Sequence, residues 1–148
     1  MLRATVDGLG AVLLLTATAA WAAGARTSIT KVGVVSVRVT TSANGTVCYQ
    51  ALRPGVRPGH SQLSACVAHL RATEIAFVLA TRHTGQQMIA GLRGPRVARV
   101  EVTLAPRVAW APKRARGVFF GYVPSGHRVV AVTKVLDDGT RRLFRVRG

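Results

Sequence analysis

Apolar and polar residues alternate along much of the chain after Arg26. Val35, Val37 and Val39 are separated by polar residues, and this period of two predicts a half-buried β-strand. The range 97–104 has the same pattern, which assigns to the inner face of a sheet the residues Ala98, Val100, Val102 and Leu104. Further strands are expected at 46–52, 74–81, 87–90, 117–123, 128–136 and 140–146.

Turn signals separate these segments at short intervals. Asn44-Gly45 and Asp138-Gly139 are typical of tight β-hairpins. The range 74–81 is apolar at nearly every position, which is typical of a central strand covered on both faces. Seven or eight short strands with turns every 8–12 residues or so predict an all-β antiparallel sandwich of immunoglobulin-like (Ig-like) architecture.

The range 61–71 is the exception and predicts one short helix. Four of its residues fall at i, i+3, i+4 and i+7, the spacing of a single helix face: Leu63, Cys66, Val67 and Leu70. The ranges 53–60 and 106–116 contain proline or glycine and are expected to be irregular.

The chain has 148 residues, and its first 25 differ in character from the rest. The range 9–25 is uncharged, apolar at first and then rich in small residues with Ala-x-Ala patterns. This predicts a secretory signal peptide, with a retained membrane anchor or a buried helix as alternatives. We therefore divide the chain into a signal or anchor segment, 1–25, and a single domain, 26–148.

Cys48 and Cys66 are the two cysteines of the chain. In an exported protein an even number of cysteines predicts a disulfide, and two buried free thiols are the alternative. A catalytic cysteine is not expected, because no base and orienting group are marked in the sequence.

The charge is strongly unbalanced, with 21 Lys+Arg against 5 Asp+Glu and a net charge of +16. Such a charge favours anionic polymers, anionic membrane surfaces or acidic proteins as partners. Alternation places Arg141, Arg145 and Arg147 on one face of the last strand. The candidate basic patch comprises Arg93, Arg96, Arg99, Lys113, Arg114, Arg116, Arg141, Arg145 and Arg147. The alternative is that these charges only protect solvated strand edges from aggregation.

No motif for catalysis, a metal or a cofactor is recognisable in the sequence. Outside the first 25 residues and the turn at 137–139, the carboxylates are Glu74 and Glu101, and both are expected at strand positions. The histidines are scattered without metal-ligand spacing: His60, His69, His83 and His127. We therefore expect no catalytic residue, no metal and no cofactor.

The segments 89–104 (IAGLRGPRVARVEVTL), 117–123 (GVFFGYV) and 128–138 together resemble a broad set of uncharacterised exported or membrane-anchored proteins of actinobacteria. The resemblance rests on two spaced cysteines, a Gly-Leu-x-Gly-Pro-x-Val element and an aromatic strand that ends in Val-Pro. The matching residues are Cys48, Cys66, Gly91, Leu92, Gly94, Pro95, Val97, Phe119, Phe120, Val123 and Pro124. The resemblance implies an extracytoplasmic compartment and a β-sandwich fold, and it implies no activity.

These observations favour a non-enzymatic domain of the cell envelope, secreted or held at the membrane by its N-terminal segment. Its basic surface would bind an anionic polymer, an anionic lipid surface or an acidic protein. Nucleic acid is a weaker candidate, because the few aromatic residues lie in apolar strands and no basic helix is predicted. A nucleic-acid-binding protein, a small envelope hydrolase and an anchored regulatory ectodomain are the alternatives.

Overall fold

The computed structural model describes residues 3–6, 25–52 and 63–147, and in these ranges every regular element is a β-strand. All strand pairs are antiparallel, so the predicted all-β antiparallel class is confirmed. The described residues form thirteen strands in three sheets, in place of the seven or eight strands expected. The third sheet also departs from the two sheets of an Ig-like sandwich.

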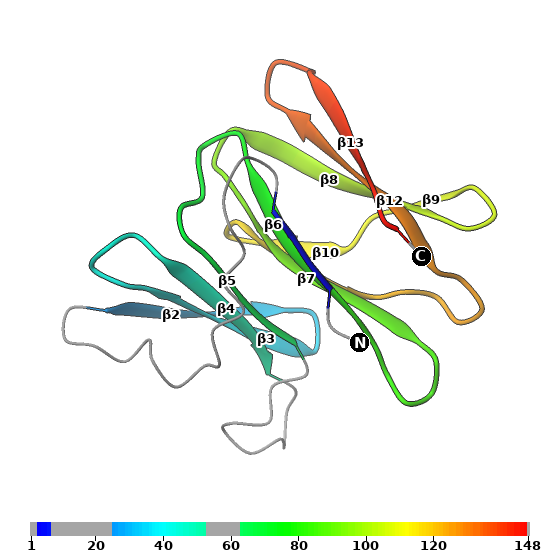
Figure 1. Ribbon diagram of the computed structural model, residues 1–148, viewed down its shortest axis with the longest axis horizontal. Helices are drawn as coiled ribbons and strands as arrows, with labels where there is room; N and C mark the ends of the chain where they lie inside the picture. The colour runs from blue at the N-terminus through cyan, green and yellow to red at the C-terminus, as the bar shows by residue number, and fades with distance from the viewer. Residues whose placement is uncertain (1–2, 7–24, 53–62, 148) are drawn as a thin grey trace.

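The central sheet lies between the other two sheets (Figure 1). The central sheet consists, in spatial order, of β1 (Arg3–Val6), β6 (Ile75–Thr81), β7 (Gln87–Arg93), β11 (Val118–Tyr122) and β10 (Lys113–Ala115). The disulfide sheet consists of β2 (Arg26–Val32), β3 (Val35–Thr41), β4 (Val47–Leu52) and β5 (Leu63–Val67). The C-terminal sheet consists of β13 (Arg141–Arg145), β12 (Val129–Leu136), β8 (Val97–Leu104) and β9 (Val108–Trp110).

The central sheet is buried on both faces, because each face packs against one of the other sheets. The side chains of Ala76 and Val78 on β6 lie in a core shared with the disulfide sheet. Ile75, Phe77 and Leu79 of the same strand lie in a second core, shared with the C-terminal sheet. The sequence prediction that 74–81 is a central strand covered on both faces is therefore confirmed.

The helix predicted at 61–71 is absent, and the described part of that range contains β5. Leu63 and Val67 do lie on one face, where both are buried in the core shared with the central sheet. Their separation of four residues fits one face of a helix and also one face of a strand. The two patterns differ at Cys66, which faces Cys48 of the neighbouring strand β4.

Strand β7 runs from Gln87 to Arg93 and does not stop at Gly91, where the sequence predicted its end. Gly91 lies between Phe77 and Phe119 of the two neighbouring strands. A Cβ atom on Gly91 would come within 2.3 Å of Cζ of Phe119 and 2.4 Å of the carbonyl oxygen of Ala76. The glycine therefore marks a close contact inside a strand and not a strand end.

The start of β8 and the range 106–116 differ in detail from the sequence prediction. Ala98 is exposed, whereas Val97 is buried, because a register shift between β8 and β12 changes which residue faces inward at the start of β8. The range 106–116, expected to be irregular, contains the short strands β9 and β10. The predicted loop at 53–60 and most of the segment 1–25 lie outside the described residues.

Cys48 and Cys66 form a disulfide between adjacent strands β4 and β5, as the sequence predicted. Their Cα atoms are 4.0 Å apart, and 18 positions separate them in the chain. Disulfides persist in oxidising environments, so the bond indicates a location outside the cytoplasm.

Removing this disulfide should lower the stability of the domain. In the chain-entropy description, closing a loop of this length contributes about 3 kcal/mol. We expect the double variant C48A/C66A to lose about that free energy of unfolding in urea denaturation. A reducing agent should bring the wild-type protein to the same stability and leave the variant unchanged. An unchanged urea midpoint in the variant would contradict this.

The contact between Gly91 and Phe119 gives a second stability prediction. Gly91→Ala should cost about 1–3 kcal/mol, because the added methyl group overlaps the Phe119 ring and a backbone carbonyl. Phe119→Leu removes the far end of that ring, so the double variant should lose less stability than the sum of the single variants. If the losses in free energy of unfolding measured by urea denaturation for the two single variants simply add in the double variant, the Phe119 ring does not exclude the methyl group.

Candidate functional site

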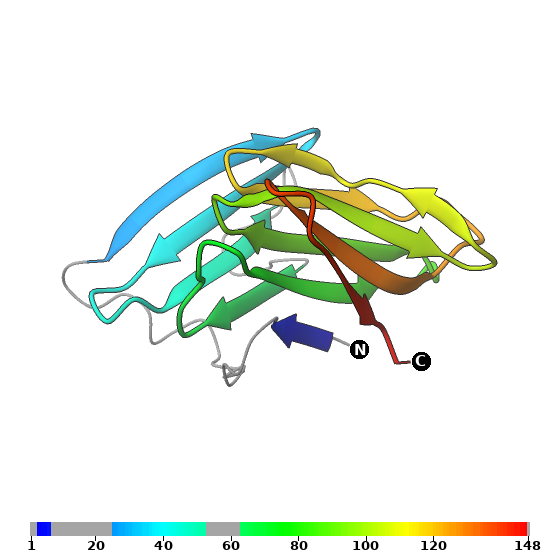
Figure 2. The ribbon, with the colours of Figure 1, turned by 90° about the horizontal axis from the view of Figure 1, so that it is seen from above.

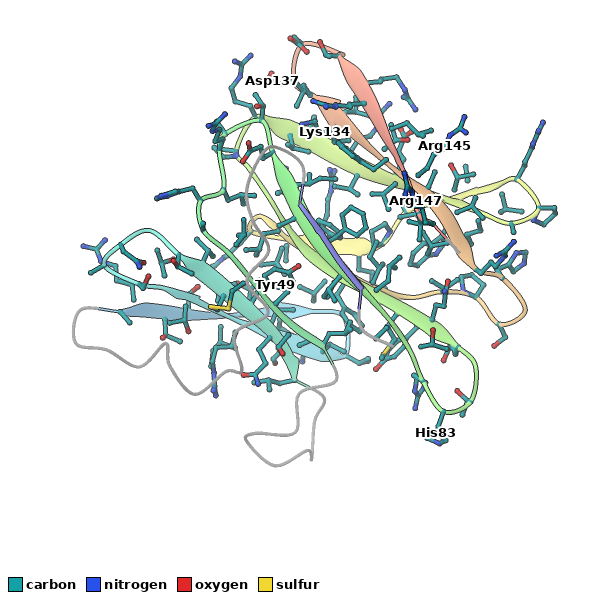
Figure 3. All side chains as sticks on the ribbon, in the orientation of Figure 1. Tyr49, His83, Lys134, Asp137, Arg145 and Arg147 are labelled. Carbon is teal, nitrogen blue, oxygen red and sulfur yellow. A yellow bond between two sulfur atoms is a disulfide. The ribbon has the colours of Figure 1, made fainter. Side chains whose placement is uncertain are left out.

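Three arginines share the outer face of the C-terminal sheet. Arg99 and Arg141 are both aligned with Val135, and Arg145 is aligned with Ala131. These positions alternate with residues such as Val100 and Phe144, which pack toward the central sheet. We call Arg99, Arg141 and Arg145 the arginine face. Figure 3 shows Arg145 near the end of β13, far from Asp137 in the turn before that strand.

One carboxylate lies within the arginine face. Glu101 accepts a hydrogen bond from Nε of Arg99 at 2.7 Å and another from Nη2 of Arg141. Hydrogen bonds from Arg141 and Arg99 lower the pKa of Glu101, so it stays ionised at neutral pH. Three cations and one anion leave this surface with two net positive charges.

A second group of cations lies where β7, β8 and β10 come together. Arg114 of β10 donates a hydrogen bond from Nη1 to the carbonyl oxygen of Ala98 at 2.6 Å. Arg93 donates one to the carbonyl oxygen of Val97, at the start of the same strand. Arg96 forms a 3.2 Å ion pair with Asp137, and the hydrogen bond and charge of Asp137 raise the pKa of Arg96. Backbone and carboxylate partners therefore hold these arginines in structural roles.

The other three members of the predicted patch lie outside these two groups. Arg116 is exposed at a positive φ of 46°, in the turn before β11. Arg147 follows β13 and is labelled with Arg145 in Figure 3. Lys113 lies on the other side of β10 from Arg114, where its Cδ is 3.0 Å from the position that a Cβ on Gly33 would take. Lys113 and Arg114 therefore lie on opposite sides of β10, and the arginine face is the most regular group among the nine predicted residues.

Lys113 belongs instead to an apolar groove that the sequence did not indicate. The groove has a volume of about 260 Å³ and is lined by Val32, Gly33, Val34, Trp110, Ala111, Lys113, Phe120, Gly121 and Tyr122. The guanidinium of Arg82 lies 5.6 Å from the centre of the Tyr122 ring. Three segments from different sheets contribute to this groove, so no local motif could reveal it.

Lys134 is a buried cation that the sequence analysis also missed. Only 6% of the residue is exposed, and its Nζ donates a 2.7 Å hydrogen bond to the carbonyl oxygen of Thr73. Nζ also lies 5.8 Å from the centre of the Phe144 ring. Burial lowers the pKa of Lys134, and the charge of Arg142 lowers it further. Lys134 thereby connects the C-terminal sheet to the segment that leads into β6.

The carboxylates and histidines form no recognisable catalytic or metal-binding arrangement in the described residues. Glu74 accepts a 3.0 Å hydrogen bond from the backbone N–H of Arg71, so it is engaged within its own turn. Nδ1 of His127 lies 2.8 Å from the carbonyl oxygen of Ala105, and His83 is at the tip of the β6–β7 hairpin (Figure 3). Within the same ranges, no group of three potential metal ligands occurs. His60 lies outside the described residues.

The pKa of Lys134 predicts a dependence of stability on pH. Its folded-state pKa lies below the ordinary 10.5, so above that lowered value the unfolded chain binds more protons than the native state. The cost of burying the charge is therefore present at neutral pH and falls as the pH rises toward 10.5. We expect wild-type protein to gain stability over that window relative to K134M.

The measurement is the difference in free energy of unfolding between the two proteins, determined by urea denaturation at several pH values. The other titrating groups are common to both proteins, so their contributions cancel in the difference. A difference that does not vary with pH would show that Lys134 titrates normally in the folded state.

Comparisons with known protein families, with curated proteins and with solved structures found no match to this chain. None of the described residues belongs to a helix long and apolar enough to cross a membrane. The disulfide and the arrangement of charges are therefore the observations on which a functional proposal can rest.

Proposed function

We propose that this protein is a non-enzymatic, extracytoplasmic domain of the cell envelope that binds an anionic polymer on its arginine face. The observation that carries the proposal is the alignment of Arg99, Arg141 and Arg145 on one exposed side of the C-terminal sheet. The disulfide supports a location outside the cytoplasm. In this proposal residues 1–25 are the export signal or membrane anchor, in keeping with the resemblance to exported actinobacterial proteins.

The spacing of the cations favours a polymer over a single small anion. Arg141 and Arg145 lie four positions apart on β13, and a strand rises about 3.4 Å per residue, so about 14 Å separates their backbones. Arg99 adds a third cation two strands away, on the same face. Charges fixed at such intervals on a sheet suit a ligand that repeats its own negative charge.

The same face is less suited to an anionic membrane. Proteins that bind the interface usually insert apolar side chains beside their cations. Leu143, which is 54% exposed, lies between Arg141 and Arg145 and is the single large exposed hydrophobic residue that the described part of this face offers. Binding would therefore be electrostatic, and it should weaken as salt screens the charges.

The test measures binding of the exported chain to polyphosphate, with neutral dextran as a reference, over rising salt concentrations. We expect affinity for polyphosphate to fall steeply with salt and dextran not to bind. Arg145→Gln should weaken binding about fivefold at low salt, since one cation near an anionic surface contributes about 1 kcal/mol. It should also reduce the slope of log affinity against log salt by about one.

Arg26→Gln is the matched control, because Arg26 is an exposed arginine of β2 in the disulfide sheet and its removal changes the net charge equally. Glu101→Gln should strengthen binding, since it frees Arg99 and Arg141 from an internal carboxylate. Equal losses in R145Q and R26Q would show that the whole molecular charge acts and that the arginine face is not the site. Tighter binding to anionic vesicles or to single-stranded DNA than to polyphosphate would show that the ligand is lipid or nucleic acid and would contradict the proposed ligand class.

A further inference from the structure

The strands at sheet edges differ in how they are protected from pairing with other chains. Edge strands expose unpaired backbone groups, and charged side chains are a common means of blocking them. Edge strands β2, β10 and β13 each carry at least two cations: Arg26 and Lys31, Lys113 and Arg114, and Arg141, Arg142 and Arg145. The edge strands β5 and β9 carry no charge but are short, with five and three residues, and short length is another means of protection. Strand β6 has no charged residue between Ile75 and Thr81, and β1 covers its outer edge.

Antiparallel geometry shows which residues of β6 face this edge. The N–H of Arg82 donates to the carbonyl oxygen of Gln86, and the carbonyl oxygen of Glu74 accepts from the N–H of Gly94. Both bonds point toward β7, so the even-numbered residues of β6 direct their backbone groups to that neighbour. The outer edge is therefore formed by the N–H and C=O groups of Ile75, Phe77, Leu79 and Thr81.

Strand β1 meets this edge over a short length. Arg3 is aligned with Leu79, and Thr5 is aligned with Phe77, so these are the pairs that exchange backbone hydrogen bonds. Figures 1 and 2 both show β1 beside β6 at the border of the central sheet. Thr81 lies beyond the register of β1.

Strand β1 belongs to residues 1–25, which the proposed function assigns to the export signal or anchor, and the present inference rests on that assignment. Cleavage removes Arg3–Val6 from the protein, and a spanning anchor places these residues across the membrane from the domain. In either case β6 becomes an edge that is apolar on both faces and free of charged residues. An edge of this kind is a template for another strand.

We propose that in the exported protein β6 of a second copy takes the place of β1, antiparallel and with the two-fold axis at Val78. This register aligns the whole of both strands: Phe77 faces Leu79 of the second copy, and Ala76 faces Ala80. All four outward-facing residues of each strand then find backbone partners. The central sheet becomes continuous through both copies, and each β6 is again an inner strand.

The residues that flank β6 favour this register. Glu74 and Arg82 lie equally far from Val78, so each end of the paired strands places Glu74 of one copy opposite Arg82 of the other. Opposite charges at facing positions stabilise a strand pair, and here they do so by charge attraction alone, because Glu74 keeps its hydrogen bond from the Arg71 N–H and Arg82 keeps its hydrogen bond to Gln86. The net charge of +16 on each copy acts against association, so the dimer should become more stable as salt concentration rises.

Cross-linking in the full-length chain tests the proposal. Val78 is the position that the two-fold axis places against itself, at about the 4.5 Å between Cα atoms of a non-hydrogen-bonded pair. A cysteine there could form a disulfide, as Cys48 and Cys66 do at 4.0 Å between Cα atoms. Thr5→Pro removes the N–H through which β1 pairs with β6 and so opens the edge without shortening the chain.

We expect T5P/V78C to give a covalent dimer in oxidising buffer, and V78C alone to give at least about fivefold less. T5P/A80C is the matched control, because Ala80 lies on the same face of β6 but opposite Ala76 of the second copy. A monomeric T5P/V78C, or equal cross-linking of T5P/A80C, would overturn the proposal. Full cross-linking of V78C without T5P would show that β1 does not hold the edge and would overturn it as well.

Sedimentation of the exported wild-type chain provides an independent readout. The dimer fraction should rise with salt, and T81P should reduce it, because the N–H of Thr81 points to the second copy and not to β7. Binding of polyphosphate falls with salt, so the two proposals have opposite salt dependence. Dimers without polymer binding would refute the proposed function alone, and polymer binding by a protein that is monomeric at every salt concentration would refute the dimer alone.

Discussion

The structure depends on a central sheet that is apolar on both faces. On β6, the side chains of Ala76 and Val78 enter one core and those of Ile75 and Phe77 enter the other. Such a strand cannot face water on either side, so a sheet must cover each face. This requirement explains why a domain of this size has three sheets. It also explains why the disulfide sheet and the C-terminal sheet present polar residues on their outer sides.

The local pattern of apolar and polar residues predicts much of this arrangement. The alternation in β3 and β8, the Asn44-Gly45 turn and the apolar β6 all predicted the observed strands. The pattern of β6 also indicated cover on both faces, which a two-sheet sandwich does not supply and three stacked sheets do. The predictions of a helix at 61–71 and of a strand end at Gly91 were wrong for another reason. In both places a neighbour distant in sequence, Cys48 or Phe119, determined the structure.

Part of the candidate site was likewise predictable from the sequence, and part depends on contacts between distant strands. Alternation along β13 was enough to place Arg141 and Arg145 on one face. Arg99 joins them through the pairing of β8 with β12, which the sequence does not specify. The carboxylate of Glu101 between two arginines and the buried Lys134 on the Thr73 carbonyl depend on the same long-range register. The sequence therefore predicted the face of β13 on which Arg141 and Arg145 lie, whereas the partners of each charged residue depend on the fold.

Protection of strand edges and binding of anions are not competing explanations for the surplus of basic residues. A charge blocks an edge wherever it lies on the edge strand, and β2 and β10 meet that need with cations on either face. Edge protection alone does not require arginines on one face of two different strands, as Arg99 on β8 and Arg141 on β13 are. Strand β9 pairs with β8 only from Val102 to Leu104, so Arg99 lies outside that pairing, where a charge on either face would block the edge. The alignment of Arg99 with the β13 cations is therefore the part of the charge pattern that anion binding explains and edge protection does not.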